Sequence, residues 1–133
     1  MKRLVVNKYG GPEVLQLENF DKLKIEESKL RIKVKNIGVN FADSLIIKGR
    51  YQERPRPPFS PGLELSGEII EIGKKISNFQ IGERVIGIAK YGTYTEEIIM
   101  PAENVYKIPD EMDYVTAASF PVAYGTAHGA ISW

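Results

Sequence analysis

The segment from Lys29 to Lys35 alternates strictly between charged and branched apolar residues. Successive side chains of a β-strand point to opposite faces of a sheet, so this pattern places Leu30, Ile32 and Val34 together on one buried face. It is the clearest strand signal in the chain. We therefore expect a fold built around a sheet that covers a hydrophobic core.

Shorter apolar runs elsewhere in the chain are separated by Gly, Pro and Asn, which favour turns. We expect further strands at Leu4–Asn7, Val14–Glu18, Leu65–Ile72, Arg84–Ala89, Tyr94–Met100 and Val105–Ile108. Many short strands with regular turns are typical of a partly closed β architecture. The predicted fold class is mainly β with short helices (α+β), in one domain over residues 1–133.

Two stretches have helical character. Residues 40–48 begin with a candidate N-cap, Asn40, and end before Gly49, which favours a helix stop. Residues 113–133 are rich in Ala but contain Pro121, so we expect two helical pieces, with the second starting near that proline. Residues 122–131 contain no Lys, Arg, Asp or Glu, and such a helix normally packs against another surface.

Composition excludes several classes of function. The chain has 18 Lys and Arg against 17 Asp and Glu, a net charge of +1, which lacks the basic excess that nucleic-acid binding usually needs. It has no Cys and one His, so disulfides, Cys-ligated zinc sites and thiol nucleophiles are excluded. No apolar run approaches a membrane span, and the first residues do not form a signal peptide. We expect a cytoplasmic protein without nucleic-acid or membrane partners.

The segment between Tyr51 and Pro61 is predicted to be a loop and a candidate lid, because its prolines exclude a helix interior or a central strand. Arg50, Arg54 and Arg56 could attract anionic phosphates, although their pattern favours a solvated run of charge.

Several polar residues admit two interpretations. Asn40 and Asp43 match a helix N-cap with an acid in the first turn, and they equally suit hydrogen bonding to a substrate. Tyr51 could donate a proton, stack on a planar ring or simply pack in its loop. Glu64 lies in an apolar context that predicts a buried, paired carboxylate, with Arg84 as a candidate partner.

Four motifs follow one another along the chain: GGPEVL at 10–15, GVNFAD at 38–43, PGLELSG at 61–67 and GERV at 82–85. In this order and spacing the sequence resembles the N-terminal catalytic domain of the medium-chain dehydrogenase/reductase superfamily, which has the GroES-like fold. The pair RY at 50–51 and the run PVAYGTAHGA at 121–130 resemble its zinc-free NADPH:quinone oxidoreductase branch. The resemblance implies a partly closed GroES-like β-barrel and a helical connection, residues 119–133, leading toward a Rossmann domain.

The same resemblance bears on metal binding. In zinc-dependent members of the superfamily, a Cys ligand stands at the position of Asn40 and a His ligand at that of Leu63, beside a glutamate that matches Glu64. An amide and an aliphatic side chain cannot replace those two ligands in a tetrahedral site. The resemblance therefore implies hydride transfer without zinc, from NADPH or NADH to a small-molecule quinone or enone.

Site roles follow in part from chemistry and in part from the resemblance. Without zinc, hydrogen bonds must polarise the substrate carbonyl, so we predict Asn40, Tyr51 and Asp43 as catalytic residues. We predict Asn40 and Thr126 as cofactor contacts, since Thr126 matches a threonine that lies near the nicotinamide in similar quinone reductases. Thr126 could equally bond its own helix backbone. For His128, an interface or surface position is favoured over catalysis.

Other interpretations stay open. The chain could belong to an enoyl or alkenal reductase of the same superfamily, or it could be a non-catalytic GroES-like binding module. No G-x-G-x-x-G phosphate motif occurs in it, so we expect it to form one wall of a cofactor cleft and to turn over little alone. An exposed C-terminal helix would also favour homo-oligomers.

Overall fold

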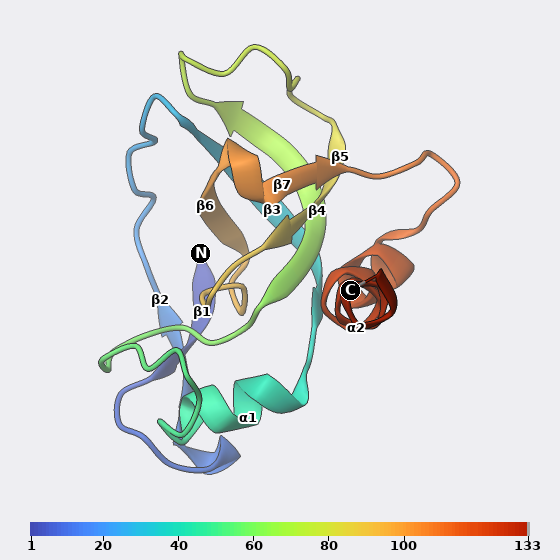
Figure 1. Cartoon of the computed structure of the whole chain (residues 1–133). Coiled ribbons are helices and arrows are strands. Elements are labelled where there is room, and N and C mark those ends of the chain that lie inside the picture. The colour runs from blue at the N-terminus through green and yellow to red at the C-terminus, as the bar shows by residue number, and fades with distance from the viewer. Residues whose placement is uncertain (133) are drawn as a thin grey trace.

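Two sheets and two α-helices form the part of the chain that the computed structural model describes, residues 1–132 (Figure 1). In chain order the elements are β1 Lys2–Val6, the 3₁₀ turn η1 Pro12–Val14, β2 Leu15–Asn19, β3 Lys29–Gly38, α1 Phe41–Ile47, β4 Glu64–Ile72, β5 Arg84–Ile88, β6 Glu97–Pro101, the 3₁₀ turn η2 Ala102–Asn104, β7 Val105–Lys107 and α2 Tyr114–Ser132. The predicted fold class, mainly β with helices, is confirmed.

The main sheet has five antiparallel strands in the order β6-β3-β4-β5-β7, and β1 and β2 form a separate two-stranded hairpin. The alternating segment lies in β3, at whose buried face Leu30 and Ile32 are both 0% exposed. The two edge strands, β6 and β7, do not pair with each other in this sheet, so it stays open and is not closed into a barrel. The prediction of a strand from 29 to 35 is confirmed, and the strand continues to Gly38.

Two hydrophobic clusters hold the elements together. The larger one lies on the main sheet and is built from residues such as Leu30, Leu65 and Val85. The smaller one packs α1 against β1 and the end of the proline-rich loop; its buried members are Val6, Ile46, Ile47 and Phe59. Backbone hydrogen bonds between Val6 and Phe59 fasten the end of that loop to β1. The second cluster therefore fixes the position of α1.

The first predicted helix is confirmed as α1. Asn40 is its N-cap residue, with extended backbone angles, and Gly49 follows its end with a φ of 66°. Glycine adopts this left-handed conformation without a steric penalty, which explains the stop. The loop from 51 to 61 is confirmed as irregular.

The C-terminal prediction of two helical pieces is wrong, because α2 runs as one helix with Pro121 inside it. Proline has no backbone N–H, so it weakens the helical ladder at this point. The N–H of the next residue, Val122, donates a hydrogen bond to the Glu64 carboxylate at 2.8 Å. The helix therefore gains an acceptor from β4 next to the position where proline removes a donor. The predicted helix also included Trp133, which lies outside the described residues.

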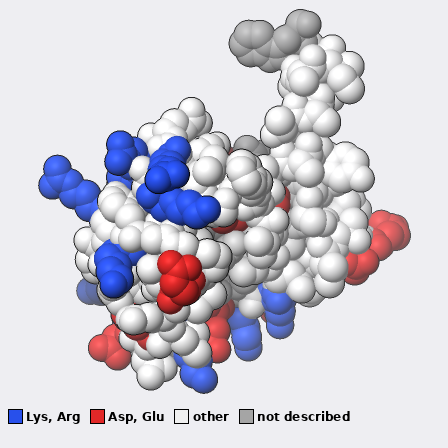
Figure 2. All heavy atoms as spheres, turned by 90° about the horizontal axis from the view of Figure 1, so that it is seen from below, with Lys and Arg blue, Asp and Glu red and all other residues white. Residues whose placement is uncertain are grey.

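The two halves of α2 have different surroundings. Ala117 and Ala118 are buried, and the helix contacts β3, β4 and β5. Beyond Val122 nearly every side chain is exposed, and Figure 2 shows the last turns leaving the body of the molecule as an uncharged projection. Within residues 1–132, neither helix combines the length and the apolar character that crossing a bilayer requires.

Candidate active site

A buried carboxylate connects three elements at the centre of the candidate site. Glu64, the first residue of β4, is 2% exposed. Its Oε1 accepts a hydrogen bond from Asn40 Nδ2 at 2.8 Å, and its Oε2 accepts one from the N–H of Val122 at 2.8 Å. Glu64 thus links β4 to the start of α1 and to the middle of α2.

The Glu64 side chain lies directly over the backbone of β3. Gly38 pairs with Glu64 across the two strands, and a Cβ atom built on Gly38 would lie 2.1 Å from Glu64 Oε1. A distance this short leaves no room for any other residue type at position 38 unless the carboxylate moves. Gly38 is therefore required for the position of Glu64.

The predicted pairing of Glu64 with Arg84 is wrong. In the antiparallel register of β4 and β5, Glu64 stands opposite Ile88, whereas Arg84 stands opposite Glu68 at the other end of the pair. Arg84 instead donates hydrogen bonds to the carbonyl oxygens of Asp110 and Met112, and its guanidinium lies 4.6 Å from the centre of the Tyr114 ring. Arg84 therefore fastens the segment that leads into α2.

Asp43 is the second buried acid of the site. Its Oδ2 accepts hydrogen bonds from the backbone N–H of Asn40 at 2.8 Å and from the Tyr94 hydroxyl at 3.1 Å. Its Oδ1 is buried and has no hydrogen-bond partner among residues 1–132. Burial raises the pKa of Asp43 above its ordinary value of 3.8, although the hydrogen bonds from Asn40 and Tyr94 oppose this rise.

Tyr94 is a component of the site that the sequence did not single out. It is 7% exposed, and burial together with the neighbouring Asp43 carboxylate raises the pKa of its hydroxyl. Tyr94 and Asp43 are 51 residues apart in the chain, so no local pattern could have joined them. The only sequence signal at Tyr94 was its place at the start of an expected strand.

A cavity of about 210 Å³ opens beside these groups. Asn40, Asp43 and Tyr94 are among the residues that line it, together with apolar residues such as Leu15 and Ile47, and its surface is almost entirely apolar. It is a small apolar hollow that borders the hydrogen-bonded groups of Asn40, Asp43 and Tyr94. The structure thus brings two of the predicted catalytic residues, Asn40 and Asp43, to one cavity.

The other two predicted site residues lie elsewhere. Tyr51 is half-buried, does not line this cavity and packs against the cluster that fixes α1. Thr126 is exposed on α2, one helical turn after Val122 and so on the same face of the helix. Leu63 packs against the same cluster as Tyr51, and His128 is exposed on α2.

The chain is similar in sequence to proteins of a known family. Residues 26–110 match the family model of the alcohol dehydrogenase GroES-like domain. The quinone oxidoreductase of Lama guanicoe is 38% identical to the chain; the alignment covers 98% of the chain and 40% of that relative.

Two solved structures have the same fold. The human synaptic vesicle membrane protein VAT-1 homolog-like protein superposes with a TM-score of 0.94 at 34% identity, over 98% of this chain and 42% of that one. The Escherichia coli quinone oxidoreductase complexed with NADPH superposes with a TM-score of 0.80 at 30% identity, over 89% of this chain and 36% of that one.

The chain therefore spans less than half the length of each of these relatives. Their agreement with the described strands and helices confirms the predicted GroES-like fold. The motifs, the fold and the matched family together lead to one conclusion: the chain belongs to the alcohol dehydrogenase GroES-like domain family, as the N-terminal domain of a quinone oxidoreductase-like member of the medium-chain dehydrogenase/reductase superfamily.

Proposed function

We propose that this chain is the catalytic-domain part of an oxidoreductase that transfers hydride from NADPH, or NADH, to a quinone or a related conjugated carbonyl without zinc. The observation that carries the proposal is the Asn40 amide, which the buried Glu64 carboxylate holds at the edge of the cavity. The likeness to proteins named quinone oxidoreductase supports the choice of acceptor.

Asn40 is the proposed group that polarises the acceptor. Its Nδ2 carries two protons, and one is used in the bond to Glu64. The second proton can be donated to a carbonyl oxygen, which favours the addition of hydride at the conjugated system. Hydrogen bonds to Asp43 and Glu64 hold the backbone N–H and the side-chain amide of Asn40, so Asn40 needs little reorganisation when the substrate binds.

A proton must follow the hydride to complete the reduction. Tyr51 does not line the cavity at Asn40, so we propose its phenol as the proton donor for an acceptor that extends beyond this cavity. We assign to Asp43 the positioning of Asn40 through the backbone bond at 2.8 Å. The bound dinucleotide supplies the hydride. In this proposal the described residues bind the acceptor, orient it and exclude water from it.

The residues at the site fit one end of such a cofactor. Thr126 offers an exposed hydroxyl, and Cβ atoms added at Gly125 and Gly129 would meet nothing within 4 Å, so the surface around Thr126 is open. Asn40 and Thr126 would hold the nicotinamide end. The pyrophosphate would need groups outside this sequence, which has no G-x-G-x-x-G motif.

Zinc-independence and location are part of the proposal. The side chain of Leu63 cannot ligate a metal, and within residues 1–132 no group of three or more His, Cys, Asp or Glu could hold one. The cytoplasm stays our prediction for the compartment.

A chimera tests the proposal. This chain would replace the aligned segment of the Lama guanicoe quinone oxidoreductase, and NADPH oxidation would be followed with 1,4-benzoquinone as acceptor. We expect turnover, and we expect Asn40→Ala and Tyr51→Phe each to lower kcat/KM by about 100-fold, the scale for losing one polarising or proton-donating group. Asn104→Ala is the matched control, because Asn104 is exposed at η2 and should leave the rate unchanged.

NADPH binding, followed by its fluorescence, distinguishes failure of the chimera from failure of the proposal. A folded chimera that binds NADPH but reduces no quinone would contradict the proposed function. Faster reduction of an α,β-unsaturated aldehyde would favour an enoyl or alkenal reductase. Binding without turnover of either acceptor would favour a non-catalytic module.

A further inference from the structure

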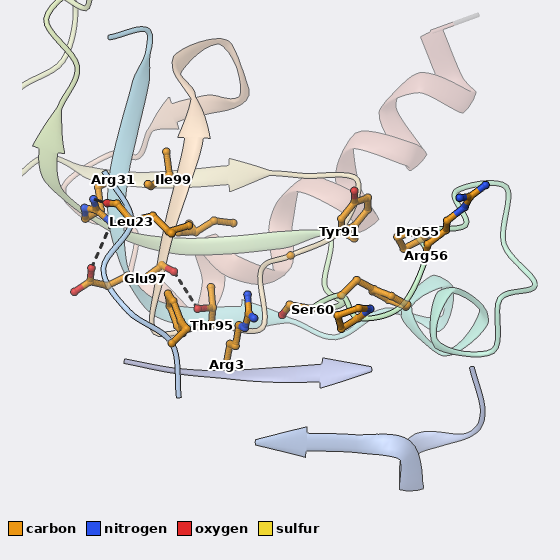
Figure 3. A pocket seen from close by; sticks show the side chains of 15 residues that line it. Arg3, Leu23, Arg31, Pro55, Arg56, Ser60, Tyr91, Thr95, Glu97 and Ile99 are labelled. Atoms are coloured by element: carbon orange, nitrogen blue, oxygen red, sulfur yellow. Dashed lines mark hydrogen bonds and ion pairs between the residues drawn. The ribbon is translucent and has the colours of Figure 1, made fainter. Parts of the chain in front are cut away.

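A second and larger cavity, of about 400 Å³, lies on another part of the molecule (Figure 3). It shares no lining residue with the cavity at Asn40. Figure 3 shows Arg31 and Glu97 at one end, Tyr91 and Arg56 at the other, and Arg3 between them. The volume falls within the usual range for small-molecule sites.

Arg31 has a structural role in this cavity. It is 2% exposed, and its Nε donates to Glu71 at 2.6 Å while its Nη2 donates to the carbonyl oxygen of Leu23. Its Nη1 lies 3.9 Å from a Glu97 oxygen. Because Glu71 and Glu97 balance its charge, we assign Arg31 to the wall of the cavity and not to a ligand.

Arg3 is different. Its Nε is buried and has no hydrogen-bond partner among residues 1–132, and the guanidinium lies over the Phe20 ring at 5.3 Å from the ring centre. A buried charged donor without an acceptor is unfavourable, and the Arg3 guanidinium has no ion pair within residues 1–132, so a carboxylate in the cavity would supply the anionic partner that it lacks. Arg56 is exposed at the far end and has no ion pair within the described chain, which adds a second cation.

Glu97 supplies the complementary feature. Its Oε2 is buried and accepts no hydrogen bond from residues 1–132. A ligand that carries a hydroxyl group could donate to this oxygen. The cavity is therefore bordered by a guanidinium, Arg3, that has no ion pair within residues 1–132, and by a carboxylate, Glu97, whose Oε2 accepts no hydrogen bond there and lies 3.9 Å from Arg31 Nη1.

The remaining walls are apolar and partly aromatic. Phe20, Leu23 and Ile99 line one part, and Phe59 and Tyr91 line another, with their rings edge to face and 6.2 Å between centres. Such walls favour a flat apolar body. We propose that this cavity binds a small aromatic carboxylate that bears a hydroxyl group, with its carboxylate on Arg3 and its hydroxyl donating to Glu97.

Calorimetric titration of the chain with 4-hydroxybenzoate tests this site without any need for turnover. We expect binding that Arg3→Gln weakens about tenfold, the scale for losing one hydrogen bond to a charged group. Arg54→Gln is the matched control, since Arg54 is exposed on the same loop as Arg56 but does not line the cavity. Ligand-induced shifts of the backbone amide resonances of Gly92 and Thr95 should locate the site.

Two further titrations probe each end of the ligand. The neutral 4-hydroxybenzyl alcohol should bind at least about tenfold more weakly, because it lacks the charge that Arg3 recognises. Glu97→Gln should reduce the preference for 4-hydroxybenzoate over benzoate. The proposal is overturned by no binding of 4-hydroxybenzoate, by equal binding of the neutral alcohol, or by a folded Arg3→Gln variant that binds as tightly as the original chain.

Discussion

Asp43 is a carboxyl group in a place where negative charge is unfavourable. It is 2% exposed, and only one of its two oxygens accepts hydrogen bonds within residues 1–132. Protonation would relieve the burial of the charge, which is why its pKa is raised in the folded protein. Asp43, which matches a helix-capping pattern in the sequence, is therefore also a buried carboxyl group of the candidate site with a raised pKa.

The raised pKa of Asp43 predicts a specific pH dependence of stability. Between the ordinary value of 3.8 and the higher folded value, the folded state binds more protons at this group than the unfolded state. The contribution of Asp43 to the free energy of unfolding should therefore fall as pH rises through this window. The Asp43→Asn variant has no titrating group at this position, so it lacks this pH-dependent contribution. Urea denaturation at several pH values should therefore show that the free energy of unfolding of the original chain falls relative to that of the variant as pH rises. A difference that is constant with pH would contradict the assignment.

Asn40 shows that two interpretations of one residue need not exclude each other. It occupies the N-cap position of α1, and its side-chain amide donates outside the helix, to Glu64. The sequence pattern of Asn40 and Asp43 was sufficient to place a helix start. It could not identify Glu64 as a partner, because that partner lies 24 residues further along the chain.

One side chain, Glu64, joins the elements β4, α1 and α2. Asn40 and Val122 each bring a donor to Glu64, and a carboxylate can accept both. The same bond supplies an acceptor to the N–H that follows Pro121, the residue that the sequence alone indicated as a boundary, and α2 runs through it as one helix.

Replacement of Glu64 tests this junction. Glu64→Gln retains one carbonyl oxygen and adds an NH₂ group, so one of the two donors must lose its acceptor. We expect the free energy of unfolding to fall by about 1–3 kcal/mol. Urea denaturation provides the measurement, and the amide resonance of Val122 should shift.

Glu68→Gln is the matched control for that variant. Glu68 lies on the same strand, but its side chain is 39% exposed, and its ion pair with Lys35 Nζ is a long one, at 3.9 Å. Such a surface pair contributes about 1 kcal/mol at most to stability. If Glu64→Gln destabilises the chain no more than Glu68→Gln does, Glu64 does not hold the junction.

At the scale of the whole molecule, α2 leaves a row of large apolar side chains in solvent. Phe120 and Tyr124 stack on each other with 4.8 Å between ring centres, and Tyr124 and Ile131 are 62% and 84% exposed. Exposed apolar patches of this kind promote association. The helix carries no charged residue that would oppose it.

We therefore expect concentration-dependent self-association through α2. Sedimentation velocity should show species larger than a monomer at high concentration, and the double substitution Tyr124→Glu with Ile131→Glu should abolish them. Leu17→Glu, at a residue 63% exposed on β2, is the control that should leave association unchanged. A monomer at every concentration would exclude this role for α2.

The local features of the fold follow from residue type and spacing. Alternation along β3, the Asn40 start and Gly49 stop of α1, and the prolines after Tyr51 all act between near neighbours, so each could be predicted from residue type and spacing. The family motifs also led correctly to the GroES-like fold.

Contacts between residues far apart in the chain depend instead on how the elements pack. Strand register places Ile88, not Arg84, opposite Glu64, and long-range contacts join Tyr94 to Asp43 and Val122 to Glu64. Hydrogen bonds between residues far apart in the chain leave no periodic pattern in the sequence, because they depend on how whole elements pack. For the same physical reason the continuity of α2 and the cavity at Asn40 emerged only once the elements were assembled.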